Sequence, residues 1–494
     1  MINRRKFLAG AAASGLTMPF LLKASLAAES GQPLPIPSVV SLDGTGNTVD
    51  AIYGSHSFLA NGKTRTMGYG QDYLGPVLRM KRGQTSKINV GNKTNNPITA
   101  HWHGLHVPGK VDGGPQLAFG PGETWSPELD IDQPAATLWY HSHVHGQTAD
   151  QVYAGLAGMI IIDDPDAGSV GLPETYGVDD IPLIVQDKAF NDDASLLYIK
   201  RGPSLMHGFR AGQILVNGAI RPTASVPSGL VRFRLLNASN ARIYTFRFED
   251  NRSFHQVASD GGLLGAPSKM SSLVLAPAER AEIIVDFSDG KAVRLVSLPD
   301  ANNPMGGGMM GGMMSRMMGG DTGEPEPVTS NDEFEIMSFD VDQQKQGAVQ
   351  TLPTTFASAP KPSFGEPVRR RRFELNMHTS GGGMMGNMGI NDKPMSMDRI
   401  DERVRLGETE IWEVFANEME HPFHIHGTSF QVLSHNGVPV DMATTGLKDV
   451  FLVNGIAELL VQFNKPADEQ TPYMYHCHIL EHEDAGMMGQ FTVA

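Results

Sequence analysis

Cysteine is almost absent from the sequence: Cys477 is the only one among 494 residues. A lone thiol cannot form an intramolecular disulfide, so Cys477 calls for a chemical explanation. The chain also has no excess of positive charge, with 39 basic against 54 acidic residues and a net charge of −15. This balance argues against nucleic acid as a partner and is compatible with binding of cations.

The sequence contains no apolar run of the roughly 20 residues that a membrane span requires. One mildly apolar stretch, 9–22, follows Arg4-Arg5 and precedes a small-residue site at 25–27. This order is typical of export signals recognised by the twin-arginine translocation machinery. We therefore predict a twin-arginine signal peptide at 1–28, with a short membrane anchor as the alternative. The mature protein is then expected in the periplasm, without a transmembrane segment.

The length of the chain exceeds that of a single core and suggests about three or four domains. Short segments of alternating apolar and polar residues, interrupted by Gly, Pro and Asn, form three blocks. A strand-like segment in each block ends in asparagine, at Asn92, Asn237 and Asn417, which indicates weak internal repetition. We predict an all-β protein with three Greek-key β-sandwich domains. Their predicted ranges are 29–168, 172–300 and 351–494.

Methionine and glycine are abundant, with 26 and 55 residues, and many of them lie between the second and third blocks. We predict a Met/Gly-rich linker at 301–350. Its Met309, Met313 and Met317 recur every four residues, which would align their thioethers along a helix, although each glycine disfavours a helix by about 1 kcal/mol. Thioethers suit Cu(I), so contact with copper and an inert linker are both open. The arginine run 369–372 is expected to be a solvated strand edge.

The single cysteine lies in His476-Cys477-His478, and His482 and Met487 follow it. Successive side chains of an extended strand point to opposite faces. Cys477 would therefore face one way and the two flanking histidines the other. One short segment can then serve two metal centres. The alternative is a buried thiol among unrelated histidines.

Three further histidine motifs occur. With the His-Cys-His motif they make two motifs near each end of the predicted mature chain. The three further motifs are His101-Trp102-His103-Gly104, His141-Ser142-His143 and His421-Pro422-Phe423-His424-Ile425-His426-Gly427. In each His-x-His, both imidazoles share one strand face and are pre-organised as ligands. A tetrahedral zinc site would use only four ligands, which is fewer than these motifs supply. A thiolate with two imidazoles and a weak thioether suits blue copper, whereas clustered imidazoles suit copper or non-haem iron.

Together the four motifs resemble those of the multicopper oxidases, which have three cupredoxin domains and a copper cluster between the first and the last. With the export signal and the methionines, the chain looks most like the periplasmic cuprous oxidases of bacterial copper tolerance. The resemblance implies four copper ions. The type 1 copper, in the third domain, would be held by His421, Cys477, His482 and an axial Met487. The type 2 copper would be held by His101 and His424, and the type 3 pair by His103, His141, His143, His426, His476 and His478.

The implied reaction couples four one-electron oxidations of substrate to the reduction of O2 to water, with Cys477 carrying electrons between the copper sites. Asp112 and Glu483 are the candidates for proton delivery, and hydrogen bonding to imidazole is the other role open to them. Met419 and Glu418, just before His421, are expected to bind substrate. Asn417 stands where the family often has an aspartate.

Cu(I) is the expected substrate of this reaction, with phenols and aromatic amines as secondary substrates. Two other functions are compatible with the resemblance. A laccase-like oxidase of organic substrates would share every metal ligand, and a copper-free cupredoxin scaffold would share the fold. We expect the protein to be a monomer.

Overall fold

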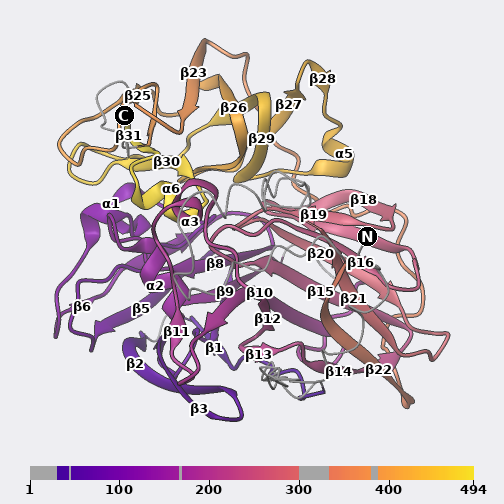
Figure 1. Cartoon of the computed structure of the whole chain (residues 1–494). Helices are drawn as coiled ribbons and strands as arrows, with labels where there is room; N and C mark the ends of the chain where they lie inside the picture. The colour runs from indigo at the N-terminus through magenta and orange to yellow at the C-terminus, as the bar shows by residue number, and fades with distance from the viewer. Residues whose placement is uncertain (1–30, 44–45, 166–169, 300–332, 380–387) are drawn as a thin grey trace, which may run out of the picture.

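The structure is a computed structural model that describes residues 31–43, 46–165, 170–299, 333–379 and 388–494. These residues form β-strands joined by turns and a few short helices (Figure 1), which confirms the predicted all-β class. The predicted signal peptide and the repeated methionines of 300–332 lie outside the described residues. Nowhere in the described ranges does a helix reach the length and apolar character needed to cross a membrane.

The first sandwich consists of two mixed sheets around a core that includes Trp102, Leu138 and Ile160. One sheet has the order β1 (Val39–Ser41), β4 (Val77–Lys81), β9 (Ala157–Asp163) and β8 (Ala136–His141). The other has the order β3 (Gly62–Tyr69), β2 (Asn47–Leu59), β5 (Gln84–Asn92) and β6 (Thr124–Trp125), with β7 (Glu128–Ile131) also on β5. Strand β8 ends at His141, so this sandwich delivers one histidine motif directly from a strand end.

The second sandwich has a larger sheet that faces a five-stranded one. The larger sheet has the order β13 (Ala219–Ile220), β12 (Gln213–Val216), β10 (Asp180–Phe190), β15 (Leu230–Asn237), β20 (Arg280–Asp286), β17 (Phe254–Ser259) and β18 (Gly262–Met270), with β11 (Leu196–Leu197) on β10. The smaller has the order β14 (Thr223–Ser228), β22 (Phe334–Gln346), β21 (Val293–Leu298), β16 (Tyr244–Phe248) and β19 (Leu273–Leu275). Buried phenylalanines, among them Phe233, Phe246 and Phe339, fill the space between the sheets.

Strand β22 corrects the predicted extent of the linker. The prediction of a linker over 301–350 is wrong for Phe334–Gln346, which pair with β21 and β14 inside the second sandwich. Ile336, Met337 and Phe339 of this strand are buried in the core. Phe356, placed by the sequence in the third domain, also packs against the second sandwich. The glycine- and methionine-rich residues before β22 concealed its apolar alternation.

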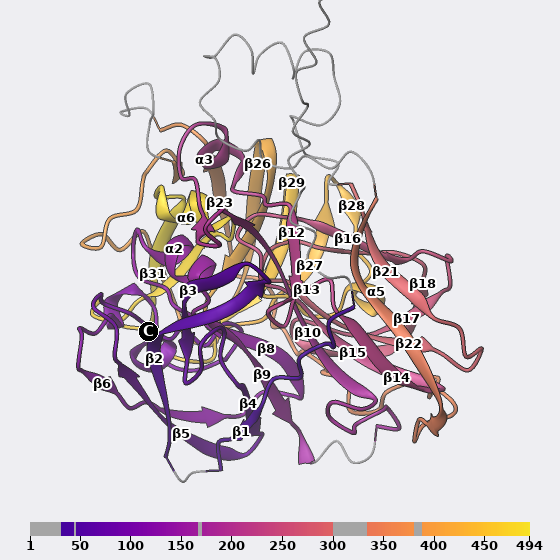
Figure 2. The same cartoon turned by 60° about the horizontal axis from the view of Figure 1, so that its bottom comes forward.

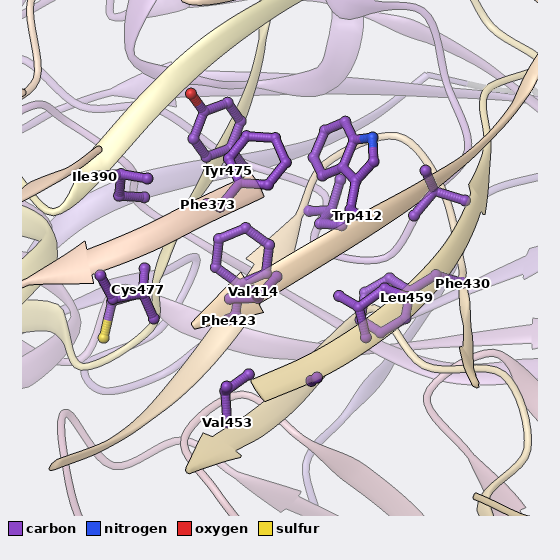
Figure 3. Packing of buried hydrophobic residues seen from close by; sticks show 14 of the residues in the cluster. Phe373, Ile390, Trp412, Val414, Phe423, Phe430, Val453, Leu459, Tyr475 and Cys477 are labelled. Carbon is purple, nitrogen blue, oxygen red and sulfur yellow. The ribbon is translucent and has the colours of Figure 1, made fainter. Parts of the chain in front are cut away.

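The third sandwich is built on two long neighbouring strands, β26 (Thr409–Ile425) and β29 (Val450–Gln462). The remaining strands are β23 (Arg369–Asn376), β24 (Gly389–Ile390), β25 (Glu402–Val404), β27 (Gln431–His435), β28 (Val438–Pro439), β30 (Tyr473–Cys477) and β31 (Met488–Val493). Figure 3 shows Phe373, Trp412 and Tyr475 packed together in its core, and Cys477 belongs to the same buried cluster. The predicted solvated edge is only partly solvated, because Arg371 of β23 is buried against Glu410.

The third sandwich lies over both of the others (Figure 1). Helix α6 (Leu480–Asp484), which follows the His-Cys-His motif, contacts α2 (Thr148–Ala154) of the first sandwich and α3 (Pro203–His207) of the second (Figure 2). The chain therefore places its cysteine motif where all three sandwiches meet.

Candidate metal centres

Eight histidines of the first and third sandwiches meet in a buried group, which we call the imidazole cluster. Its members are His101, His103, His141, His143, His424, His426, His476 and His478, each at most 1% exposed. Backbone pairing sets their positions: His101 bridges to His141, and His424 of β26 pairs with His476 of β30. All eight were predicted as ligands, and the structure brings them together.

The imidazole cluster contains three sets of three histidines, with His103 in two of them, and within each set the ligand atoms lie within 4.8 Å of one another. The sets are His101 with His103 and His424, His103 with His141 and His478, and His143 with His426 and His476. The Nε2 atom of His476 lies 3.2 Å from Nε2 of His143 and 3.3 Å from Nε2 of His426. Two nitrogens bound about 2.0 Å from one ion in tetrahedral geometry would be about 3.3 Å apart. The spacing fits ligands that share a metal.

The nitrogens that face the middle of the cluster are available to a metal. Nε2 of His101, His141 and His424 and Nδ1 of His103 are buried without a hydrogen-bond partner in the described part of the chain. Burial, followed by the neighbouring histidines, lowers the pKa of His103, His424 and His426 well below the ordinary value of histidine. These imidazoles are therefore neutral at pH 7 and keep a free lone pair.

Three acidic residues each hold one histidine of the first sandwich and one of the third. Asp112 lies at the end of α1 (Gly109–Asp112), Glu483 lies in α6, and Asp449 directly precedes β29. The pairs are Asp112 with His101 and His426, Glu483 with His143 and His476, and Asp449 with His103 and His424. A partner on the outer nitrogen sets the tautomer and the orientation of a ligating imidazole.

Asp112 and Glu483, the two candidates for proton delivery, both contact imidazoles of the cluster. Asp112 Oδ2 lies 2.8 Å from His426 Nδ1 and 3.3 Å from His101 Nδ1. Glu483 Oε2 lies 3.2 Å from His476 Nδ1, and its Oε1 lies 3.4 Å from His143 Nδ1. Both carboxylates thus touch the outer edge of the imidazole cluster.

Asp449 was missed by the sequence reasoning. Its Oδ1 lies 3.1 Å from His103 Nε2, and its carbonyl oxygen accepts a hydrogen bond from His424 Nδ1 at 2.8 Å. It has no histidine next to it in the chain. The one available signal was its place before an apolar strand, and that signal says nothing about histidines more than twenty residues away.

A second buried group, which we call the thiolate site, consists of His421, Cys477 and His482. Cys477 Sγ lies 3.3 Å from His421 Nδ1 and 3.7 Å from His482 Nδ1, and the two nitrogens are 3.3 Å apart. Met487 is also fully buried, and its carbonyl oxygen accepts the Cys477 N–H at 3.1 Å. Burial raises the pKa of the Cys477 thiol, and a bound cation would favour its deprotonation.

The outer nitrogens of the two thiolate-site histidines differ in their hydrogen-bond partners. His482 Nε2 is 3.1 Å from the carbonyl oxygen of Met206, so α3 of the second sandwich covers it. His421 Nε2 is buried without a partner among the described residues. Directly before His421 in the sequence, β26 has a bulge between Ala416 and His421. Asn454 of β29 lies opposite this bulge. A bulge of this kind re-aims side chains next to functional sites.

The bulge carries the predicted substrate residues. Glu418 is exposed, whereas Met419 is half-buried and packs against the core of the third sandwich. Glu420 Oε1 accepts a hydrogen bond from Asn454 Nδ2 at 2.9 Å, which ties the bulge to β29. Asn417 is exposed.

Fold and sites define the class of the protein: a three-sandwich metalloprotein whose thiolate and imidazole groups suit copper. Models of the family described as multicopper oxidase match residues 51–167 and 368–494. The chain belongs to the multicopper oxidase family.

Relatives of this family carry two kinds of name. Cell division protein FtsP of Xenorhabdus nematophila is 34% identical, over 100% of this chain and 98% of its own. Multicopper oxidase mco of Staphylococcus haemolyticus is 35% identical, over 90% of this chain and 88% of its own. The chain is thus similar over nearly its whole length to an oxidase and to a protein named for cell division.

Solved structures of the family share the fold, as two of them illustrate. A laccase-like multicopper oxidase, CueO, from Ochrobactrum sp. has a TM-score of 0.82 and 39% identity, covering 94% of this chain and 100% of that one. A multicopper oxidase from Campylobacter jejuni, described as a metallo-oxidase, has a TM-score of 0.78 and 26% identity, covering 94% and 95%.

Proposed function

We propose that the chain is a copper-dependent oxidase that couples four one-electron oxidations of substrate to the reduction of O2 to two water molecules. One observation carries the proposal: Cys477 lies in the thiolate site while His476 and His478 lie in two different sets of the imidazole cluster. Three consecutive residues therefore provide a direct covalent link between the two sites. Metal bound there supplies one-electron redox chemistry and the reduction of O2.

Four copper ions are assigned to these residues. The type 1 ion is assigned to His421, Cys477, His482 and Met487, and the type 2 ion to His101 and His424. The type 3 pair is assigned to His103, His141 and His478 for one ion and to His143, His426 and His476 for the other. Asp112 and Glu483, at the rim of the imidazole cluster, are proposed to pass protons toward the site of water formation.

Cu(I) is the substrate we propose first. Met419 offers a soft thioether on the bulge beside His421, and Glu418 adds a carboxylate. His482, the other imidazole of the thiolate site, is covered by Met206, which leaves a large phenol no direct contact with its outer nitrogen. The net charge of −15 favours the approach of a cation.

The test compares O2 consumption of the copper-loaded protein with Cu(I) and with a dimethoxyphenol. Met419→Leu keeps the volume and removes the sulfur, so kcat/KM for Cu(I) should fall about tenfold, a loss of roughly 1.4 kcal/mol. Met270→Leu, on β18 of the second sandwich, is the matched control and should leave it unchanged. Rapid turnover of the phenol with no Cu(I) oxidation would instead support the laccase-like function, which the lignin-compound activity of the Ochrobactrum relative favours.

A non-catalytic scaffold remains the alternative that the cell-division name of FtsP brings forward. The two functions differ in optical properties, because thiolate-bound Cu(II) absorbs visible light intensely and a scaffold without copper does not. A purified, copper-supplemented sample that stays colourless and consumes no O2 would establish the scaffold.

We also propose periplasmic export of the protein as a monomer through the twin-arginine route. The double variant Arg4→Lys, Arg5→Lys should stay in the cytoplasm, as measured by cell fractionation. Normal export of this variant would refute the route.

A further inference from the structure

The second sandwich supplies no ligand atom to either metal centre in the described parts of the chain. One of its residues nevertheless reaches the edge of the imidazole cluster. Arg280, the first residue of β20, is fully buried, with 0% exposure. A charged side chain in that setting is costly unless every donor is satisfied.

All five N–H donors of the Arg280 guanidinium have acceptors. Nε donates to the carbonyl oxygen of Thr137 in the first sandwich at 3.1 Å. One donor each of Nη1 and Nη2 goes to the carbonyl oxygens of Ala278 and Asp260 in the second sandwich. The other two form a fork with the Asp449 carboxylate of the third sandwich, at 2.6 and 2.5 Å. One side chain thus joins all three sandwiches.

Asp449 passes this restraint on to two histidines. Its Oδ1, which Arg280 holds, also lies 3.1 Å from His103 Nε2. Its carbonyl oxygen accepts from His424 Nδ1. His103 and His424 stack with ring centroids 3.7 Å apart, and their inner nitrogens face the cluster. The position of Asp449 therefore fixes one imidazole from each side of the domain interface.

The loop around Asp449 is braced by further residues of the second sandwich. Lys448 Nζ bonds both Asp260 and Glu279 at 2.9 Å. The Gly261 N–H donates to the carbonyl oxygen of Leu447 at 2.8 Å. The segment that carries Asp449 is thus held from the second sandwich at three successive residues.

We propose that Arg280 is a positioning residue for the type 2 ligand His424 and the type 3 ligand His103, acting through Asp449. The second sandwich then helps to position the ligands of the proposed O2-reducing centre and does more than separate the other two sandwiches. This inference rests on the copper assignment above. Asp112 and Glu483 hold the remaining clamped histidines without a comparable guanidinium among the described residues, so the Arg280 restraint is specific to one edge of the cluster.

The experiment compares Arg280→Met with Arg234→Met in the full-length protein. Arg234 is a matched control because it is also a buried cation of the second sandwich, with a fork to Asp180 and a bond to Glu282. Neither acid hydrogen-bonds a histidine within the described residues. Both variants should lower the apo-protein unfolding temperature, because each leaves a buried carboxylate uncompensated.

Copper retention separates positioning from mere stability. Arg280→Met should weaken copper binding at the imidazole cluster about 10- to 100-fold, the usual effect of removing a ligand's supporting partner. The type 2 electron paramagnetic resonance signal and the copper content should fall, while the visible absorption of the thiolate site persists. Arg234→Met should keep all of these. Equal copper loss in both variants, or full retention in Arg280→Met, would overturn the proposal.

Two further variants distinguish position from charge. Arg280→Lys keeps the charge but loses the fork, and it should resemble Arg280→Met in copper content. Arg280→Met with Asp449→Asn removes the uncompensated charge, so apo stability should recover while the type 2 signal stays weak. Recovery of the signal in the double variant would overturn the positioning role. Failure of the proposed function looks different, because the unsubstituted protein itself would then bind no copper at the imidazole cluster.

Discussion

The thiolate site and the imidazole cluster are adjacent but are built differently. The thiolate site takes all its residues from the third sandwich, between His421 and Met487. The imidazole cluster needs histidines from the first and third sandwiches, acids that bridge them, and the Arg280 guanidinium from the second sandwich. The first site draws its ligands from one core, with an outside contact between His482 and the Met206 carbonyl, whereas the second site depends on the closure of the domain interface. Suitable substitutions should therefore impair one site and leave the other unchanged.

Cys477→Ser should give the largest effect and break the link between the sites. Serine cannot supply the soft thiolate, so the blue absorption and O2 consumption should both be lost. The type 2 signal should remain, because its ligands lie elsewhere. Circular dichroism provides the control that the three-sandwich fold is intact, and a variant that stays blue would contradict the assignment.

Asp112→Asn should affect the imidazole cluster alone. The amide is a weaker partner for His101 and His426, so O2 reduction should fall about 10- to 100-fold. Reduction of the thiolate site by substrate under anaerobic conditions should proceed at the normal rate, measured by bleaching of the blue band. Equal slowing of both half-reactions would show that the two sites do not separate in this way.

Acid should destabilise the apo-protein through the buried histidines of both sites. Burial lowers the pKa of His421 to about 3, below the value of about 6.5 in the unfolded chain. The unfolded state therefore binds the proton first, and stability falls as the pH drops below about 6.5. For His421 alone the loss at pH 5 is about 2 kcal/mol. Urea unfolding at pH 7.5 and 5 should show a smaller pH effect in His421→Gln, and an unchanged effect would contradict this origin.

Met487→Leu should give the smallest change and confine it to the thiolate site. The side chains have similar volumes, so the free energy of unfolding should fall by less than about 1.5 kcal/mol. Loss of the thioether should raise the reduction potential of the type 1 copper, measured by redox titration of the blue band. The type 2 signal is the internal control, and its alteration would mean that Met487 serves both sites.

The ligand motifs were readable from the sequence because strand geometry is local. Alternation at the end of β30 (Tyr473–Cys477) places Cys477 opposite His476, and His478 follows directly after the strand. Asp112 and Glu483 were found because they stand close to ligand motifs. Strand β22 was hidden because the glycine- and methionine-rich residues before it extended the expected linker past its start.

The sequence by itself determined the all-β class, the two kinds of candidate metal centre and their covalent connection, since these depend on alternation within strands and on the short spacings within each ligand motif. Only the tertiary structure decided how the imidazoles are held. Asp449, Arg280 and the Met206 carbonyl act across interfaces between sandwiches. Hydrogen bonds of this kind join residues far apart in the chain and leave no periodic pattern, so they exist only once the domains have closed on one another.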